Sequence, residues 1–541
     1  MKRFLFLAAI LCGATWLPAQ ILTVTPTFPS QNDTVTIVYD ATEGNGALTG
    51  ISPVYAHTGL ITNQSTSPTD WQLVQGNWGT ADANVVMTDL GNNLHEIKYH
   101  IPTYYNLPAG DTAFKMAFVF RNADGSVVGR DPNGDDIFYD LFNNSQLSAV
   151  FNSPAQRGMI VDPMSSINLV VSASNSATLT VTDNGNQVFS VTGTTHTQAL
   201  QVTGTGDHEV ILLADDGNFT ASDTFHYTVL PSPSLQALPA GTELGINYLN
   251  DSTVRLRLFA PNKGFVYVVG EWTDYLPSEA YHMHKTPDQA TYWIDLTGLN
   301  PGQEYAFQYN VDDEVHIADP YSELVLDPDN DGWIPPSTYP NLRPYPSGKI
   351  DGFLTIIFPG KAPYNWQVTN FQKPAKTDLV IYELLMRDFL AAHDYETLID
   401  TLDYLENLGI NAIELMPVNE FEGNDSWGYN PSFHMATDKY YGTIEALKDF
   451  IDEAHSRGIA VILDVVYNHA FSQSPLCQLY WDDANFKPAA NNVWLNVDAR
   501  HDFNVGYDFD HSSNATKDWV DRVMKYWLEE FKIDGFRFDL S

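Results

Sequence analysis

From Lys376 onward the chain alternates between short apolar runs and helical patterns, which restricts this region to a parallel β/α architecture. Apolar residues recur at helical spacing between the runs, and Gly409 and Gly458 end two of these patterns. Strand–helix–strand units with glycine stops are typical of parallel sheets. The predicted strands are 379–385, 410–416, 459–465 and 533–539, and the predicted helices lie in 398–405, 444–454 and 519–531. We therefore predict that residues 376–541 form the first half of an eight-stranded β/α barrel, which as a whole needs about 250 residues.

Two of the predicted strands end in carboxylates. Asp464 opens the run Asp-Val-Val-Tyr-Asn-His, and Asp539 closes the run Gly-Phe-Arg-Phe-Asp. Carboxyl ends of barrel strands are where β/α barrels hold their catalytic groups. Because side chains alternate along a strand, Arg537 should share a face with Asp539, stabilise its charge and orient it. The structural alternatives are an ion pair that only fills the barrel and, for His469, a core histidine.

The region before the barrel is predicted to be all-β. Short β-rich runs alternate with Gly/Asn/Asp turns, and no helical stretch of useful length intervenes between residues 21 and 229. A break near Asn143 and a Pro/Ser stretch at 231–233 divide this region. The predicted fold class is thus multidomain, with N-terminal all-β sandwiches followed by a partial β/α barrel. The predicted domains are 20–145, 146–231 (immunoglobulin-like), 240–370 and 376–541.

The formal net charge of −40 argues against nucleic acid or an anionic membrane as a partner. A neutral sugar feels no such repulsion. No segment after the N-terminus approaches about 20 uninterrupted apolar residues, so no transmembrane span is expected. The sequence gives no indication of the oligomeric state.

Residues 1–19 have the pattern of a cleaved secretion signal. A basic flank, Lys2-Arg3, precedes a short apolar stretch that ends near Ala19. A buried first strand is the alternative. Removal of the signal leaves Cys477 as the single cysteine, so the exported chain is expected to have no internal disulfide. We expect the protein to be secreted or held at the cell surface.

The strand-end motifs at 464–469 and 535–539 resemble the first two signature regions of the α-amylase superfamily, which are retaining α-glucan-active glycoside hydrolases. A further run, Ile410–Val418, resembles the second strand of that family. Two others agree with its branching-enzyme and pullulanase groups: Val380–Phe389 and Trp427–Pro431, the last followed by Tyr441-Gly442. The resemblance implies that Asp539 is the catalytic nucleophile, with Arg537 beside it. It also implies that Asp464 and His469 bind sugar hydroxyls and that Tyr429 stacks on the sugar ring.

The predicted module 240–370 resembles the glycogen-binding-type β-sandwich that precedes the barrel in those enzymes. Trp272 and Trp293 could stack on glucose rings, and core or interface aromatics are the alternative. The first module resembles extracellular starch-binding sandwiches, which makes Trp71 and Trp78 candidate stacking residues. The second module is expected to be a spacer.

The resemblance requires no cofactor for the chemistry, but it makes a structural Ca²⁺ a candidate. Asn468 matches a position that ligates calcium in many relatives, although branching-type relatives often lack the ion. Further oxygen ligands would come from the long loop 470–513, which contains Asp498, Asp502, Asp508 and Asp510. A second acidic run, 327–332, opens like an EF-hand loop, but Thr338 stands at its twelfth position and a turn is the better interpretation.

The sequence therefore predicts a secreted glycoside hydrolase that cleaves α-glucosidic bonds in starch-like or glycogen-like glucans. The alternatives are an α-glucan branching transferase and a surface starch-binding protein with a non-catalytic barrel. The sequence does not indicate whether the cleaved bond is α-1,4 or α-1,6. A retaining mechanism also needs a general acid, expected after a fifth strand and therefore beyond Ser541. Residues 1–541 alone are accordingly expected to be inactive and to expose an open sheet edge.

Overall fold

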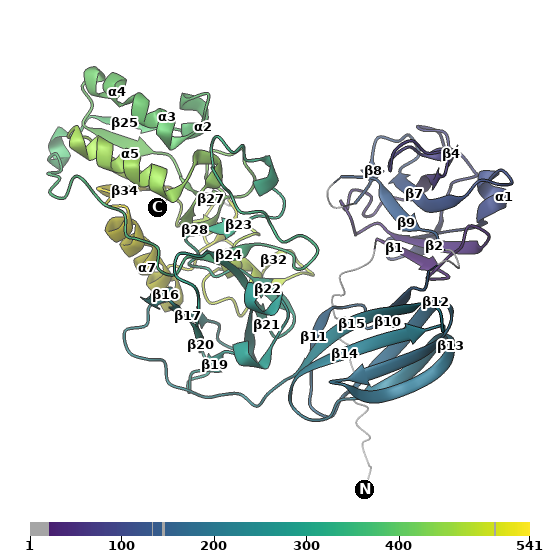
Figure 1. The fold of residues 1–541 in the computed structure, drawn as a ribbon. Coiled ribbons are helices and arrows are strands. Elements are labelled where there is room, and N and C mark those ends of the chain that lie inside the picture. The colour runs from purple at the N-terminus through teal and green to yellow at the C-terminus, as the bar shows by residue number, and fades with distance from the viewer. Residues whose placement is uncertain (1–20, 132–133, 143–145, 503–504, 541) are drawn as a thin grey trace, which may run out of the picture. The chain divides into compact units, whose positions relative to one another are not determined.

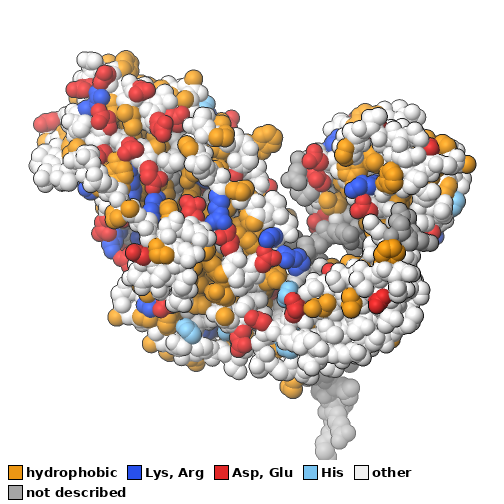
Figure 2. Space-filling model, viewed as in Figure 1, with side chains coloured by type: hydrophobic (Ala, Val, Ile, Leu, Met, Phe, Trp, Pro, Cys, Tyr) orange, Lys and Arg blue, Asp and Glu red, His pale blue; other side chains and the backbone are white. Residues whose placement is uncertain are grey.

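The computed structural model describes residues 21–131, 134–142, 146–502 and 505–540, and the chain divides into two compact units, residues 1–230 and 231–541. The predicted export signal, residues 1–19, lies outside the described residues. The predicted fold class is confirmed, because all-β modules precede a set of parallel strands flanked by helices (Figure 1). No helix among the described residues is long and apolar enough to cross a membrane. On the face shown in Figure 2, acidic side chains are more frequent than basic ones, as the net charge requires.

The first unit begins with two antiparallel sheets that share one apolar core. One sheet has the strand order β1-β2-β6-β5; the other has the order β4-β3-β7-β8, with β9 also paired to β7. Ile37 from the first sheet and Phe118 from the second are both fully buried in this core, as expected of a β-sandwich. The bounds are β1 Leu22–Thr25, β2 Thr34–Asp40, β3 Tyr55–Thr62, β4 Gln72–Gln75, β5 Thr88–Gly91, β6 Leu94–His100, α1 Ile101–Tyr105, β7 Ala113–Arg121, β8 Val128–Gly129 and β9 Ile137–Asp140.

The remainder of the first unit is a single six-stranded sheet. Its order is β10-β12-β14-β15-β11, and β13 also pairs with β12; β11 is parallel to β15 and the other pairs are antiparallel. The strands join in one sheet rather than in two separate ones, whereas an immunoglobulin-like module has two. The bounds are β10 Ala149–Ser153, β11 Gly158–Val161, β12 Ser166–Asp183, β13 Asn186–Gln201, β14 Gly206–Asp215 and β15 Thr220–Val229.

The second unit opens with another β-sandwich. Its two antiparallel sheets have the orders β16-β17-β20-β19 and β18-β21-β24-β23, with β22 paired to β21. Every residue of β18 and β21 is buried, because these strands lie between the sandwich core and the rest of the unit. The bounds are β16 Gly245–Asn250, β17 Thr253–Phe259, β18 Val266–Gly270, η1 Glu271–Thr273, η2 Glu279–Tyr281, β19 His284–Lys285, β20 Thr291–Thr297, β21 Tyr305–Val311, β22 Val315–Ile317, β23 Val325–Leu326, η3 Asp331–Trp333 and β24 Leu354–Ile357.

Four parallel strands form the partial barrel in the order β25-β26-β29-β34. They are β25 (Ile381–Leu384), β26 (Ala412–Leu415), β29 (Ala460–Val465) and β34 (Gly535–Phe538). Each of these strands lies within one of the four predicted strand ranges. The central strands are largely buried, whereas Ile381 and Phe538 on the two outer strands are 47% and 42% exposed.

Helices cover one side of this sheet, and their sequences show why they begin and end where they do (Figure 1). The predicted helix 398–405 is divided at Thr401 and ends at Gly409, which adopts a positive φ of 86°. In α5, the Thr443 side chain accepts a hydrogen bond from the Ala446 amide and caps the first turn. The bounds are η4 Lys376–Asp378, α2 Met386–Phe389, α3 Tyr395–Asp400, α4 Leu402–Leu408, α5 Ile444–Ser456, α6 Pro475–Gln478 and α7 Asn514–Glu530.

Two connections between barrel strands carry hairpins. The connection from β26 to α5 contains β27 (Asn419–Phe421), β28 (Pro431–Thr437) and η5 (Lys439–Tyr441); we call residues 419–437 the β27–β28 hairpin. The connection from β29 to α7 is longer and contains two short pairs, β30 with β33 and β31 with β32. Their bounds are β30 His469–Ala470, β31 Trp481–Asp482, β32 Lys487–Pro488 and β33 Tyr507–Asp508.

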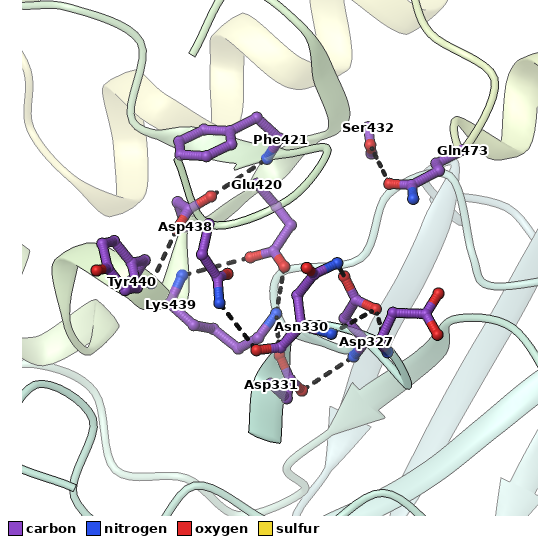
Figure 3. A network of polar contacts seen from close by, with 12 residues as sticks. Asp327, Asn330, Asp331, Glu420, Phe421, Ser432, Asp438, Lys439, Tyr440 and Gln473 are labelled. Atoms are coloured by element: carbon purple, nitrogen blue, oxygen red, sulfur yellow. Dashed lines mark hydrogen bonds and ion pairs between the residues drawn. The ribbon is translucent and has the colours of Figure 1, made fainter. Parts of the chain in front are cut away.

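A buried polar cluster joins the sandwich of the second unit to the base of the β27–β28 hairpin (Figure 3). It contains Lys439 and the carboxyl groups of Asp331, Glu420 and Asp438, all less than 9% exposed. The acidic run 327–332 supplies the sandwich side of the cluster and forms a turn that leads into η3, as predicted. The Lys439 ammonium is therefore the cation of this cluster, and it offsets the charge of several buried carboxylates.

The cluster predicts a pH dependence of stability. Burial raises the pKa of Asp438 to about 7, and Lys439 opposes the rise. A raised folded-state pKa stabilises the fold below the unfolded-state pKa of 3.8, and this contribution is lost as the pH increases toward 7. In urea unfolding, the unfolding free energy of the wild type relative to Asp438→Asn should fall by a few kcal/mol between pH 4 and pH 7. Parallel pH profiles for the two proteins would contradict this.

Candidate active site

The two predicted catalytic motifs meet at the carboxyl ends of β29 and β34. Asp464 and Arg537 are register partners in the parallel pair. The Asp539 amide continues the pairing beyond β34 and donates to the Val465 carbonyl at 3.0 Å. Neighbouring strands thus place Asp464, Arg537 and Asp539 at the same end of the sheet.

Arg537 is shared between two carboxylates. Its Nη1 lies 2.9 and 3.0 Å from the two oxygens of Asp464 and 2.8 Å from Oδ1 of Asp539. Burial acts to lower the pKa of Arg537, but the hydrogen bonds to both carboxylates dominate and raise it. The guanidinium therefore stays charged and fixes the orientation of Asp539, whose side chain is 18% exposed and reachable by a ligand.

Tyr429 and His469 complete the group of predicted site residues. The Tyr429 hydroxyl donates to Oδ2 of Asp464 at 2.6 Å, and His469 Nε2 donates to the Tyr429 carbonyl at 2.8 Å. Burial lowers the pKa of His469, so the ring is neutral near pH 7. Its Nδ1 can then accept the hydrogen bond from the Asn468 amide, at 3.3 Å. All five predicted catalytic and sugar-binding residues thus lie together.

Asp464 and Asp539 differ in burial and in their hydrogen bonds, and this difference suits them to different roles. Asp464 is fully buried, and this burial raises its pKa although Tyr429 and Arg537 both donate to it. Burial, followed by the hydrogen bond to Asp464, raises the pKa of Tyr429 and keeps its hydroxyl a donor. Asp464 is thus held as a fixed acceptor, and Asp539 is the aspartate with an accessible side chain.

The structure adds two residues that the sequence reasoning did not select. Carboxylate oxygens of Glu383 and Glu414 lie within 4.8 Å of one another and of Asp464. The Glu414 carboxylate is 4.0 Å from Arg537 Nε, and burial raises its pKa. The pairing of β25 with β26 brings them together, because Glu383 and Glu414 are register partners. Glu414 thus adds a third carboxyl group beside Arg537.

The long connection after β29 packs against His469 and encloses a cavity. A side chain at Gly506, which has a positive φ of 59°, would come within 2.6 Å of the Ala470 carbonyl and 3.0 Å of the His469 ring. Beside this contact lies a cavity of about 460 Å³. Among its lining residues are Phe486, Lys487, Asp498, His501 and Tyr507. The site therefore borders a space with both aromatic and charged walls.

The residues proposed as calcium ligands do not converge. Asp498 pairs with Lys487, Asp510 with Arg500, and Asp508 accepts from Asn496 and His501. The Asn468 side chain bonds His469 instead, and Asp502 is exposed. Calcium requires six to eight oxygen ligands. Among the described residues, protein cations and amides already occupy Asp498, Asp508 and Asp510, so this arrangement does not fit the ion.

The two tryptophans of the second-unit sandwich do not present an accessible ring face for stacking on a sugar. Trp293 is 7% exposed, its indole N–H faces the Gln236 carbonyl at 3.4 Å, and Arg255 lies over its ring. Trp272 is partly buried and packs against Tyr281 at a ring distance of 5.5 Å. The structure thus favours the alternative of core and interface aromatics, because little ring face is accessible.

The first module presents one accessible indole. Trp78 is 49% exposed, and the buried Arg121 guanidinium lies 5.8 Å from its ring centroid. His57 packs edge-on against the same ring at 5.3 Å. Trp71 is partly buried and stacks on His57. Of the two predicted stacking residues, Trp78 therefore offers an open and well-supported face.

Comparison with known proteins finds similarity in two parts of the chain. Residues 387–494 match the alpha amylase catalytic domain family. This part of the chain is therefore similar to the α-amylase superfamily. Residues 22–128, outside the α-amylase domain, match a domain of unknown function, DUF8578.

Relatives of the α-amylase domain have several activities. A malto-oligosyltrehalose trehalohydrolase from Saccharolobus solfataricus is 32% identical over 260 residues, which are 48% of this chain and 40% of that protein. A 1,4-alpha-glucan branching enzyme from Fusobacterium nucleatum is 25% identical over 54% of this chain and 45% of that protein. The chain thus spans less than half of the length of these relatives.

Solved structures give only a partial superposition. A putative alpha amylase from Salmonella typhimurium superposes with a TM-score of 0.43 and 26% identity, covering 55% of this chain and 43% of that one.

Proposed function

We propose that Asp539 is the nucleophile of a retaining enzyme that acts on α-glucosidic bonds. The observation that carries this proposal is the Arg537 guanidinium shared between Asp464 and Asp539 at adjacent strand ends. A nucleophile must be ionised and correctly oriented when the sugar arrives, and a charge-assisted hydrogen bond provides both. The similarity of residues 387–494 to the α-amylase catalytic domain supports α-glucans as the substrate class.

In the proposed reaction an Asp539 oxygen attacks the anomeric carbon as the glycosidic C–O bond breaks. The leaving oxygen receives a proton from a general acid, which is not assigned among the described residues. Asp464 and the neutral His469 would hold hydroxyl groups of the reacting sugar, with Tyr429 against its ring. Water or an acceptor hydroxyl then attacks the anomeric carbon, gives its proton to the conjugate base of the same general acid and displaces the Asp539 carboxylate, so the original configuration is restored.

Hydrolysis is the favoured outcome, and branching transfer is the alternative. The export pattern of residues 1–19 supports hydrolysis, because polymer outside a cell is degraded rather than built. The full-length protein should release reducing sugar from soluble starch, which would establish α-1,4 hydrolysis, or from pullulan alone, which would indicate debranching. An iodine-stain shift on amylose without sugar release would indicate branching instead. Binding of starch without sugar release and without an iodine-stain shift would indicate a starch-binding protein with a non-catalytic barrel.

We also propose that the first module binds α-glucan through Trp78. The supporting observation is its half-exposed indole, held from below by Arg121 and from the edge by His57. A rigid aromatic face matches the apolar face of a pyranose and loses little conformational entropy on binding.

Trp78→Ala should weaken binding of the full-length protein to soluble starch by about tenfold, because the stacking surface is removed. Affinity electrophoresis in starch-containing gels would measure the change. Phe114→Ala is the matched control, since Phe114 is an aromatic residue of the same module with a similar exposure of 45%. Equal retardation of the two variants would contradict a binding role for Trp78.

A further inference from the structure

The polar cluster between the sandwich and the barrel is centred on one lysine. Lys439 Nζ lies 3.2 Å from Asp331 Oδ1 and directly contacts Glu420 Oε1 (Figure 3). Asp331 belongs to the sandwich, whereas Glu420 and Lys439 stand at the base of the β27–β28 hairpin. Lys439 is only 1% exposed. A fully buried ammonium between two carboxylates restricts all three side chains to one arrangement.

On the sandwich side of this contact, Asp331 is held by hydrogen bonds within its own turn. Asp331 Oδ2 accepts from the Asp327 amide at 2.9 Å, which leaves Oδ1 directed at Lys439. Asp327 Oδ2 in turn accepts from the Asn330 side chain at 2.8 Å. The turn 327–331 therefore holds Asp331 in place through its own hydrogen bonds.

A second contact ties the same turn to the tip of the hairpin. The Asn424 side-chain amide donates to the Asn330 carbonyl at 2.8 Å. The hairpin is thus held by the sandwich at its base, through Lys439, and near its tip, through Asn424. Two attachment points on one rigid turn fix both the position and the tilt of the hairpin.

This hairpin carries Tyr429 into the candidate active site. Tyr429 contacts Asp464 through its hydroxyl and His469 through its carbonyl. The preceding Gly428 has a positive φ of 88°, and a side chain there would come within 2.5 Å of the Pro417 carbonyl. The backbone before Tyr429 is therefore closely packed, so a shift of the hairpin is transmitted to the tyrosine ring.

We propose that Asp331 is a positioning residue for the active site. Through Lys439 and the β27–β28 hairpin, it fixes the Tyr429 ring at the distance from Asp464 that the reacting sugar requires. The sandwich therefore contributes to catalysis without touching the substrate. This inference rests on the proposed function, because it concerns the same site.

The test is a double-mutant cycle in the full-length protein, with maltooligosaccharide hydrolysis or transfer as the readout. Asp331→Asn removes the charge toward Lys439 and should lower kcat/KM about tenfold. Asp329→Asn is the matched control, because Asp329 lies in the same turn but is exposed, and it should have no effect. In a Tyr429→Ala background, Asp331→Asn should change kcat/KM less than about twofold. An equal loss in both backgrounds would overturn the proposal, because a purely structural role acts independently of Tyr429.

A second readout does not depend on activity. Backbone amides of residues 422–430 should exchange hydrogen faster in Asp331→Asn than in Asp329→Asn, as measured by mass spectrometry. Unchanged exchange would overturn the positioning role. If the wild type acts on no α-glucan, the proposed function fails, and the exchange comparison alone then decides whether Asp331 positions the hairpin.

Discussion

Asp539→Asn is expected to reduce kcat/KM of the full-length protein on maltooligosaccharides by at least about 10⁴-fold. The amide keeps the shape of the side chain and can still contact Arg537, but it cannot form the glycosyl ester on which the second half of the reaction depends. Because the nucleophile and its partners act as a unit, the loss should be far larger than that of any single binding contact.

The matched control for this variant is Asp400→Asn. Asp400 is an exposed aspartate at the end of α3, on the helical layer rather than at the strand ends. It should retain wild-type kinetics, and both variants should show wild-type thermal unfolding. Sugar release by Asp539→Asn within about tenfold of the wild type would assign the nucleophile to another residue.

Lys439→Met should lower the free energy of unfolding by about 3–5 kcal/mol. Methionine fills much of the same volume, but it leaves Glu420 and Asp331 buried without their ammonium partner. Burial already raises the pKa of Glu420, and Lys439 opposes this rise. The loss should therefore be greater at pH 8 than at pH 5, because the carboxyl groups can take up protons at the lower pH.

Urea unfolding of Lys439→Met and Lys376→Met would measure this effect. Lys376 is exposed at the start of the barrel region, and its replacement should change stability by less than about 0.5 kcal/mol. Adding Glu420→Gln to Lys439→Met should recover part of the loss, since it removes one of the stranded charges. Equal stability of the two single variants would show that Lys439 contributes no net ion-pair energy.

The strand pattern of the barrel was predictable because each strand is a short apolar run, and glycines end the helical patterns after the first two strands. Gly409 terminates its helix in the left-handed conformation, as local sequence alone can indicate. The division of the helix region at Thr401 was not predicted, since apolar spacing continues across it. Strand periodicity likewise placed Arg537 beside Asp539, because their separation along one strand determines their common face.

Other features of the site depend on segments distant in sequence. The sequence reasoning gave no reason to choose Glu414, whose place beside Arg537 follows from the pairing of separate strands. The candidate calcium ligands Asp498, Asp508 and Asp510 pair with Lys487, His501 and Arg500, which the sequence did not indicate. Such pairing depends on how a long loop returns on itself, which no local pattern encodes.

The sequence by itself determined the all-β modules, the parallel β/α region and the strand-end residues Asp464, Arg537 and Asp539, because periodicity and glycine stops are local properties of the chain. Only the tertiary structure decided that Trp293 is buried and Trp78 is accessible. It also decided that the acidic run 327–331 binds Lys439 rather than forming an isolated turn. The physical reason is that burial and ion pairing depend on which surfaces meet, and distant segments bring those surfaces together.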